Sequence, residues 1–143
     1  MEFSVQQKNE FRPLPSGSKH QSITRAQLKL LISRGQSEGD TLTTGYLLQV
    51  LGDKEAEIGN IKTGHLLHRK AINLETDTPL PHLIYATGLF RAFNRPDLAI
   101  KQIRELRSLL QIGKWKPTVN EPSHNWYLKQ LNSLCDEIKM AFK

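Results

Sequence analysis

Residues 59–77 read GNIKTGHLLHRKAINLETD, and two interpretations of this stretch lead to different folds and functions. His65 and His68 stand three residues apart with carboxylates downstream, as they would in a metal site. A structural zinc ion requires four ligands, and a catalytic zinc ion requires three protein ligands and a water molecule. A third ligand would have to come from His82 or a loop carboxylate, and the single cysteine is distant. We therefore expect no metal, and we expect His68 to pack between two helices.

The second interpretation treats the same stretch as part of a repeating unit. When the sequence is shifted by 35 residues, Leu48 aligns with Leu83 and Ala71 aligns with Leu106. Each unit has the apolar period of a helix of about a dozen residues, then a short turn and a second helix. The pattern therefore predicts two helical hairpins, at residues 44–76 and 80–111.

This repeat resembles the tetratricopeptide repeat, whose period is roughly 34 residues. The similar stretches are Gly52, Gly59-Asn60, Ala71 and KAINLETD in the first unit, and YATGLF and NRPDLAIKQI in the second. Three positions depart from the family pattern. Glu55 stands where an aromatic residue is usual, His68 stands where a large apolar residue is usual, and Gly88 lies one residue away from the usual small-residue position. The resemblance covers about residues 44–110. It implies an all-α fold, a short right-handed stack of antiparallel helix hairpins.

Single helices are predicted on both sides of the hairpins. Thr24 and Gln27 are spaced as a capping box at the start of the first helix, and Gly35 is placed to end it. A polar loop is expected at residues 36–43. Ser123 is a candidate cap for the last helix, residues 123–143, whose apolar stripe comprises Leu128, Leu131, Leu134, Cys135, Ile138 and Phe142. Because a hairpin cannot bury its apolar face alone, we expect these two helices to cap the stack.

The remaining sequence indicates one domain with an N-terminal arm. Residues 1–22 combine prolines with scattered apolar residues and predict an extended or flexible arm, and a chain of 143 residues suits a single helical domain at 23–143. No apolar run is long enough to span a bilayer, and the N-terminus lacks the pattern of a secretory signal. The single cysteine, Cys135, favours a reducing compartment, so we expect a cytoplasmic protein.

The sequence contains no catalytic motif, neither a phosphate-binding glycine loop nor a nucleophile elbow. We therefore expect no enzymatic activity and no cofactor. The tetratricopeptide resemblance implies instead that a peptide or amphipathic helix of another protein binds the concave groove. The positions carried over to this groove are Tyr46, Gln49, Asp53, Ile84, Gly88 and Arg91. The chain would then be a small adaptor, a chaperone or a structural subunit of an assembly such as a bacterial secretion machine. Contact of these residues with the N-terminal arm or the flanking helices is the alternative.

A second hypothesis assigns a role to the basic charge, since the net charge of +6 permits attraction to nucleic acid. A cationic ridge ending in an aromatic side chain could hold phosphates and stack a base. The candidate residues are Lys101, Arg104, Arg107, Lys114, Trp115 and Lys116. The alternative is a solvated helix face that serves solubility alone.

Overall fold

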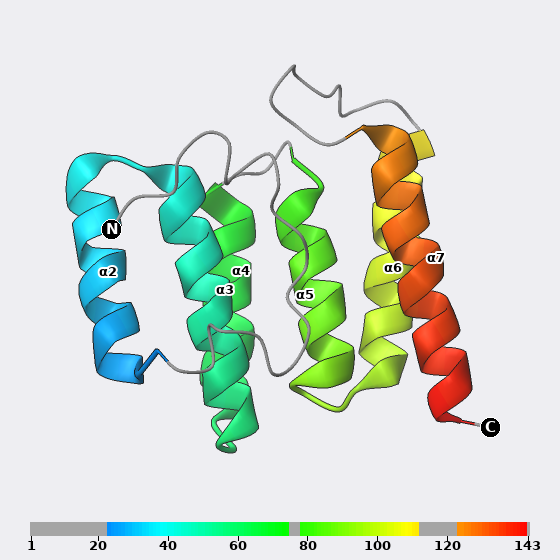
Figure 1. Cartoon of the computed structure of the whole chain (residues 1–143), viewed down its shortest axis with the longest axis horizontal. Coiled ribbons are helices and arrows are strands. Elements are labelled where there is room, and N and C mark those ends of the chain that lie inside the picture. Colours follow the sequence, from blue (N-terminus) through cyan, green and yellow to red (C-terminus); the bar gives the residue numbers. More distant parts are fainter. Residues whose placement is uncertain (1–22, 75–77, 112–122, 143) are drawn as a thin grey trace.

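The computed structural model describes residues 23–74, 78–111 and 123–142. Within these ranges every regular element is an α-helix, which confirms the all-α prediction. The helices are α2 (Arg25–Glu38), α3 (Thr41–Glu57), α4 (Ile61–Leu74), α5 (Leu80–Arg91), α6 (Pro96–Gln111) and α7 (His124–Ala141). Each helix runs antiparallel to the one before it (Figure 1).

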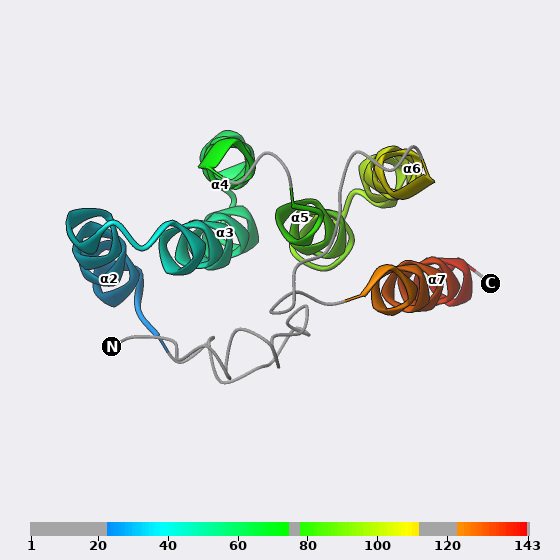
Figure 2. The ribbon, with the colours of Figure 1, turned by 90° about the horizontal axis from the view of Figure 1, so that it is seen from above.

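The helices form two layers when the molecule is seen from above (Figure 2). Helices α3, α5 and α7 make the front layer, which faces the viewer in Figure 1, and α4 and α6 make the rear layer. Helix α2 packs on α3 at one end of the front layer, and α7 packs on α5 and α6 at the other. Because α3 and α5 have neighbours on most sides, 11 of the 17 residues of α3 and 8 of the 12 residues of α5 are buried.

The apolar core is divided into two clusters. One lies among α2, α3 and α4 and includes Leu28 and Leu47, and the other lies chiefly among α5, α6 and α7 and includes Leu106 and Leu131. Each fully buried leucine side chain contributes about 1.5–3 kcal/mol. The two single helices α2 and α7 thus each complete the apolar cluster of a neighbouring helix pair.

The end of α2 differs from the prediction. The helix continues through Gly35 to Glu38, and Gly39 forms the left-handed cap with a φ of 72°. Gly35 is buried because α2 and α3 approach closely there, and a Cβ atom on it would overlap the hydroxyl of Thr44. The predicted loop at residues 36–43 is therefore wrong over most of its length, since Asp40 already caps α3.

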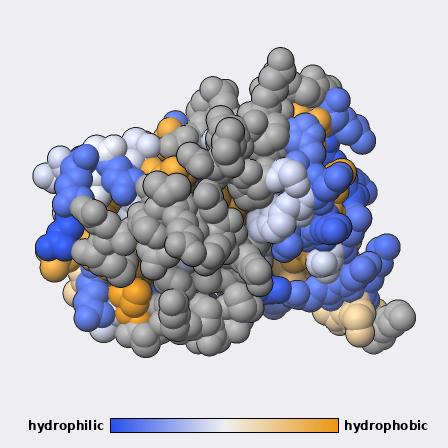
Figure 3. All heavy atoms as spheres, turned by 45° about the horizontal axis from the view of Figure 1, so that its top comes forward, coloured by the Kyte–Doolittle hydropathy of each residue, from blue (hydrophilic) through white to orange (hydrophobic). Residues whose placement is uncertain are grey.

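The predicted cap of α7 is confirmed, because the Ser123 side chain accepts a hydrogen bond from the backbone N–H of Trp126. The predicted apolar stripe is wrong at its edges, where Leu128 is 40% and Phe142 68% exposed. The buried face consists instead of Tyr127, Leu131, Leu134 and Ile138. The opposite face of α7 carries mainly polar side chains, and this end of the molecule is largely hydrophilic in Figure 3.

Candidate partner-binding face

A buried polar network lies where α3, α4 and α5 meet. The side chain of His68 is completely buried, as the sequence predicted. Gln49 Nε2 lies 2.8 Å from the carbonyl oxygen of Pro81 and 3.0 Å from His68 Nδ1. A carbonyl oxygen can only accept, so the amide nitrogen donates one hydrogen to Pro81 and the other to His68. His68 Nδ1 is therefore an acceptor, and the ring hydrogen sits on Nε2, which donates to Asp53 Oδ1 at 2.7 Å.

Aromatic rings enclose this network on the α5 side. The ring of Tyr85 stacks on that of His68 with centroids 4.8 Å apart and an interplanar angle of 22°. The Tyr85 hydroxyl lies 2.6 Å from Nδ1 of His65, whose ring also packs on Phe93. Burial lowers the pKa of His65, and the positive charge of Arg69 lowers this pKa further. Both histidines of the opening sequence thus contribute to packing between helices.

In the part of the chain that the structure describes, no ligand set for a metal ion accompanies the two histidines. Among the described residues, no group of three or more histidine, cysteine, aspartate or glutamate side chains could hold an ion. Within that part of the chain, the structure therefore supplies no third protein ligand for zinc at His65 and His68.

Glycines allow the helices around the network to approach closely. A Cβ atom on Gly64 of α4 would lie 2.7 Å from the carbonyl oxygen of Gly52 on α3. A Cβ atom on Gly88 of α5 would overlap Oδ1 of Asp53. The carboxylate of Asp53 therefore occupies space that only a glycine at position 88 leaves open.

The residues predicted for the groove divide into two groups. Gln49 is 1% exposed and bonds inside the chain, so its assignment to a partner-contacting surface is corrected. Ile84 and Gly88 are also buried, because α5 has neighbours on most sides. The other three residues, Tyr46, Asp53 and Arg91, keep exposed surface on the front layer.

Tyr46 and Asp53 lie on the same side of α3, since seven residues make about two helical turns. Burial raises the pKa of the Tyr46 hydroxyl far above its ordinary value, and the negative charge of Asp53 raises it further. This effect indicates that the carboxylate and the phenol share one partly solvated region of the front layer.

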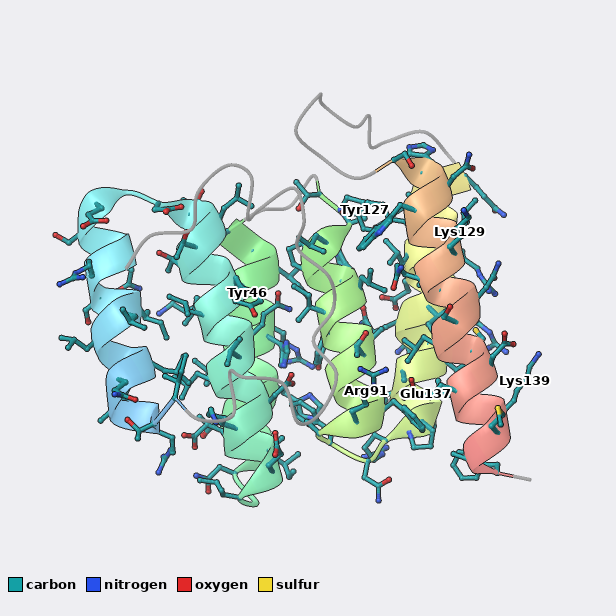
Figure 4. The ribbon with its side chains drawn as sticks, in the orientation of Figure 1. Tyr46, Arg91, Tyr127, Lys129, Glu137 and Lys139 are labelled. Carbon is teal, nitrogen blue, oxygen red and sulfur yellow. The ribbon has the colours of Figure 1, made fainter. Side chains whose placement is uncertain are left out.

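Arg91 is held by an ion pair that the sequence analysis did not identify. Its Nε donates to Glu137 Oε2 at 2.9 Å, and its Nη2 donates to Oε1, which ties α5 to α7 (Figure 4). The pair raises the pKa of Arg91 and lowers the pKa of Glu137. No local sequence signal could reveal a contact between residues 46 positions apart.

The predicted basic surface is only partly assembled. Lys101 and Arg104 are exposed on α6. Arg107 turns toward α7 and donates to Asn132 Oδ1 at 3.0 Å. The other predicted members, Lys114, Trp115 and Lys116, lie outside the described residues.

None of the described helices combines the length and apolar composition needed to cross a membrane. Comparison of the chain with protein-family profiles, curated proteins and solved structures found no match.

Proposed function

We propose that this chain is a non-enzymatic protein-interaction module, a small tetratricopeptide-like adaptor, chaperone or assembly subunit whose front layer binds a segment of another protein. A cytoplasmic location suits a chain with a single cysteine. The two-layer alternation of α3 and α5 with α4 and α6 supports the relationship to helical-hairpin repeats.

The observation that carries this proposal is the fixed polar surface of the front layer. Asp53 is held by buried His68, and Arg91 is held by Glu137, so neither side chain must be ordered when a partner binds. Interfaces gain affinity when their contact groups are already held in place. The half-buried ring of Tyr46 adds the kind of aromatic anchor that is common at binding hot spots.

The test is partner recovery with a matched pair of variants. The tagged full chain is expressed in its native cell, cross-linked and purified, and co-purifying proteins are quantified. Tyr46→Ala should reduce recovery of the specific partner about tenfold or more, as expected for a hot-spot residue. Phe142→Ala, which removes an exposed aromatic ring at the far end of α7, should leave recovery unchanged. If Tyr46→Ala and wild type recover the partner equally and have the same helicity, the front layer is ruled out as the partner-binding surface.

A second candidate function, association with nucleic acid, is favoured by the charge of the rear layer. Helix α4 contains no carboxylate. Its exposed cations and those of α6 form no ion pairs within the part of the chain that the structure describes. These cations are Lys62, Arg69, Lys70, Lys101 and Arg104.

Oligonucleotide binding tests this second candidate. If the rear layer holds phosphates, the affinity for a fluorescent oligonucleotide should fall steeply with salt, because counterions are released. Replacing Lys62, Arg69 and Lys70 by glutamine should flatten that salt dependence, whereas replacing Lys129 and Lys139 on α7 should not. An affinity that is weak and equal in the wild type and both multiple variants would exclude the rear layer as a nucleic-acid-binding surface.

A further inference from the structure

Asp53 combines a fixed position with an unused hydrogen-bonding atom. Its Oδ1 accepts the hydrogen of His68 Nε2, and its side chain is 30% exposed. The hydrogen bonds of the described residues leave Oδ2 of Asp53 without a donor. Since His68 Nδ1 accepts from Gln49, the ring carries no hydrogen there, and the charge of Asp53 is not balanced by an imidazolium.

Among the described residues, no cation supplies a balancing positive charge for Asp53. The described lysines and arginines form no ion pair with Asp53. Arg91, which lies on the neighbouring helix of the same layer, is occupied by Glu137. A carboxylate that is partly removed from water attracts a cation more strongly than a fully exposed one does.

The surroundings of Asp53 explain why this carboxylate is held in place. The ring of His68 donates a hydrogen bond to Asp53, and the amide of Gln49 holds that ring from its other side. Because Gly88 has no side chain, the carboxylate of Asp53 fits against α5. A backbone carbonyl oxygen would be a sufficient hydrogen-bond acceptor for the buried N–H of His68, so this hydrogen bond does not by itself require a carboxylate. The observed arrangement also presents a charged oxygen on the side of α3 that carries Tyr46.

We propose that Asp53 is the anchor for a cationic side chain, an arginine or lysine flanked by apolar residues, in the protein segment that binds the front layer. The inference rests on the proposed function and specifies its partner class. Oδ2 of Asp53 accepts from the cation, and the Tyr46 ring packs against the aliphatic part of the same side chain or an adjacent apolar residue. Charge-assisted hydrogen bonds of this kind are about twice as strong as neutral ones.

The net charge of the chain allows specific binding of a basic peptide to be distinguished from non-specific electrostatic attraction. With a net charge of +6, the protein attracts acidic peptides by its overall field. A preference for basic peptides therefore runs against the global charge and requires a local acidic site.

The experiment is selection from a phage-displayed library of random dodecapeptides on the immobilised full chain. Four baits are compared: wild type, Asp53→Asn, Glu57→Gln and Tyr46→Ala. Asparagine keeps an oxygen that accepts from His68, so Asp53→Asn removes the charge and retains the fold. Glu57→Gln is the matched control, because Glu57 is an exposed carboxylate on the same helix.

Wild type and Glu57→Gln should enrich peptides with arginine or lysine beside apolar residues, and Asp53→Asn should lose this enrichment. Individual peptides should bind Asp53→Asn about 10- to 100-fold more weakly, the range for a hydrogen bond to a charged group. Replacing the arginine of a selected peptide by neutral citrulline should weaken its binding to wild type by the same factor as Asp53→Asn. This replacement tests the anchor without any protein variant.

Three outcomes would overturn the proposal. Basic peptides that bind wild type and Asp53→Asn equally would exclude Asp53 as their anchor. Peptides that require Tyr46 but carry no cation would refute the anchor and leave the proposed function standing. Recovery only of acidic peptides, bound equally by all four baits, would count against both.

Discussion

The close approach of α3 and α4 predicts that Gly64→Ala destabilises the protein. Alanine is better than glycine in a helix interior by about 0.8–1.0 kcal/mol. A Cβ at position 64 would, however, lie 2.7 Å from the backbone oxygen of Gly52 and 2.9 Å from Cζ of Phe93. Overpacking of this kind costs about 1–3 kcal/mol, and the upper end applies because a backbone carbonyl cannot rotate away. The expected net loss is about 2 kcal/mol.

Gly45→Ala is the matched control on α3. There the new Cβ would lie 3.9 Å from its nearest neighbour, the carbonyl oxygen of Ala71, so only the gain in helix propensity remains. Thermal unfolding followed by circular dichroism measures both variants. At this chain length 1 kcal/mol corresponds to about 3 °C. Gly64→Ala should therefore melt about 6 °C lower, and Gly45→Ala up to about 3 °C higher. Equal shifts in the two variants would show that α3 and α4 do not approach at Gly64.

Three further predictions follow from the buried network, the α5–α7 ion pair and the histidines. Gln49→Leu leaves the Pro81 carbonyl and His68 Nδ1 without their donor. The free energy of unfolding, measured by urea denaturation, should therefore fall by about 2–4 kcal/mol. The control Gln36→Leu, at an exposed position, should change this free energy by less than about 0.5 kcal/mol. Glu137→Gln weakens a partly exposed ion pair, so the loss should be about 0.5–1 kcal/mol and should shrink in high salt. Burial lowers the pKa of His65 and His82, so the unfolded chain binds more protons than the folded chain below about pH 6.5. Stability should therefore fall as the pH drops below that value, and a His65→Gln, His82→Gln double variant should show a smaller fall in denaturation midpoints between pH 7 and 5.5. An unchanged fall in the double variant would exclude these two histidines as its source.

Helix identity could be predicted from the sequence because it depends on local signals. The apolar period and the caps at Thr24 and Ser123 involve residues within one or two turns of each other. The end of α2 was harder, and the prediction that Gly35 ends this helix is wrong. Only the packing of α2 on α3 shows that Gly35 serves close approach and that Gly39 adopts the positive φ.

The candidate site was less predictable, because it depends on how helices face one another. The resemblance to tetratricopeptide repeats placed Gln49 in the groove, but the packing of α4 and α5 turns its amide inward to His68 and Pro81. The pairing of Arg91 with Glu137 depends on where α7 docks on α5. The sequence did indicate that His68 is buried, because it occupies an apolar position of the repeat.

The protonation of His68 is the most direct test of the buried network, on which the fixed position of Asp53 depends. A long-range proton–nitrogen correlation spectrum of the imidazole rings reports which nitrogen carries hydrogen. We expect an unprotonated Nδ1 and a slowly exchanging hydrogen on Nε2, donated to Asp53. A hydrogen on Nδ1, or an Nε2 hydrogen that exchanges freely with water, would show that His68 does not hold Asp53 in this way.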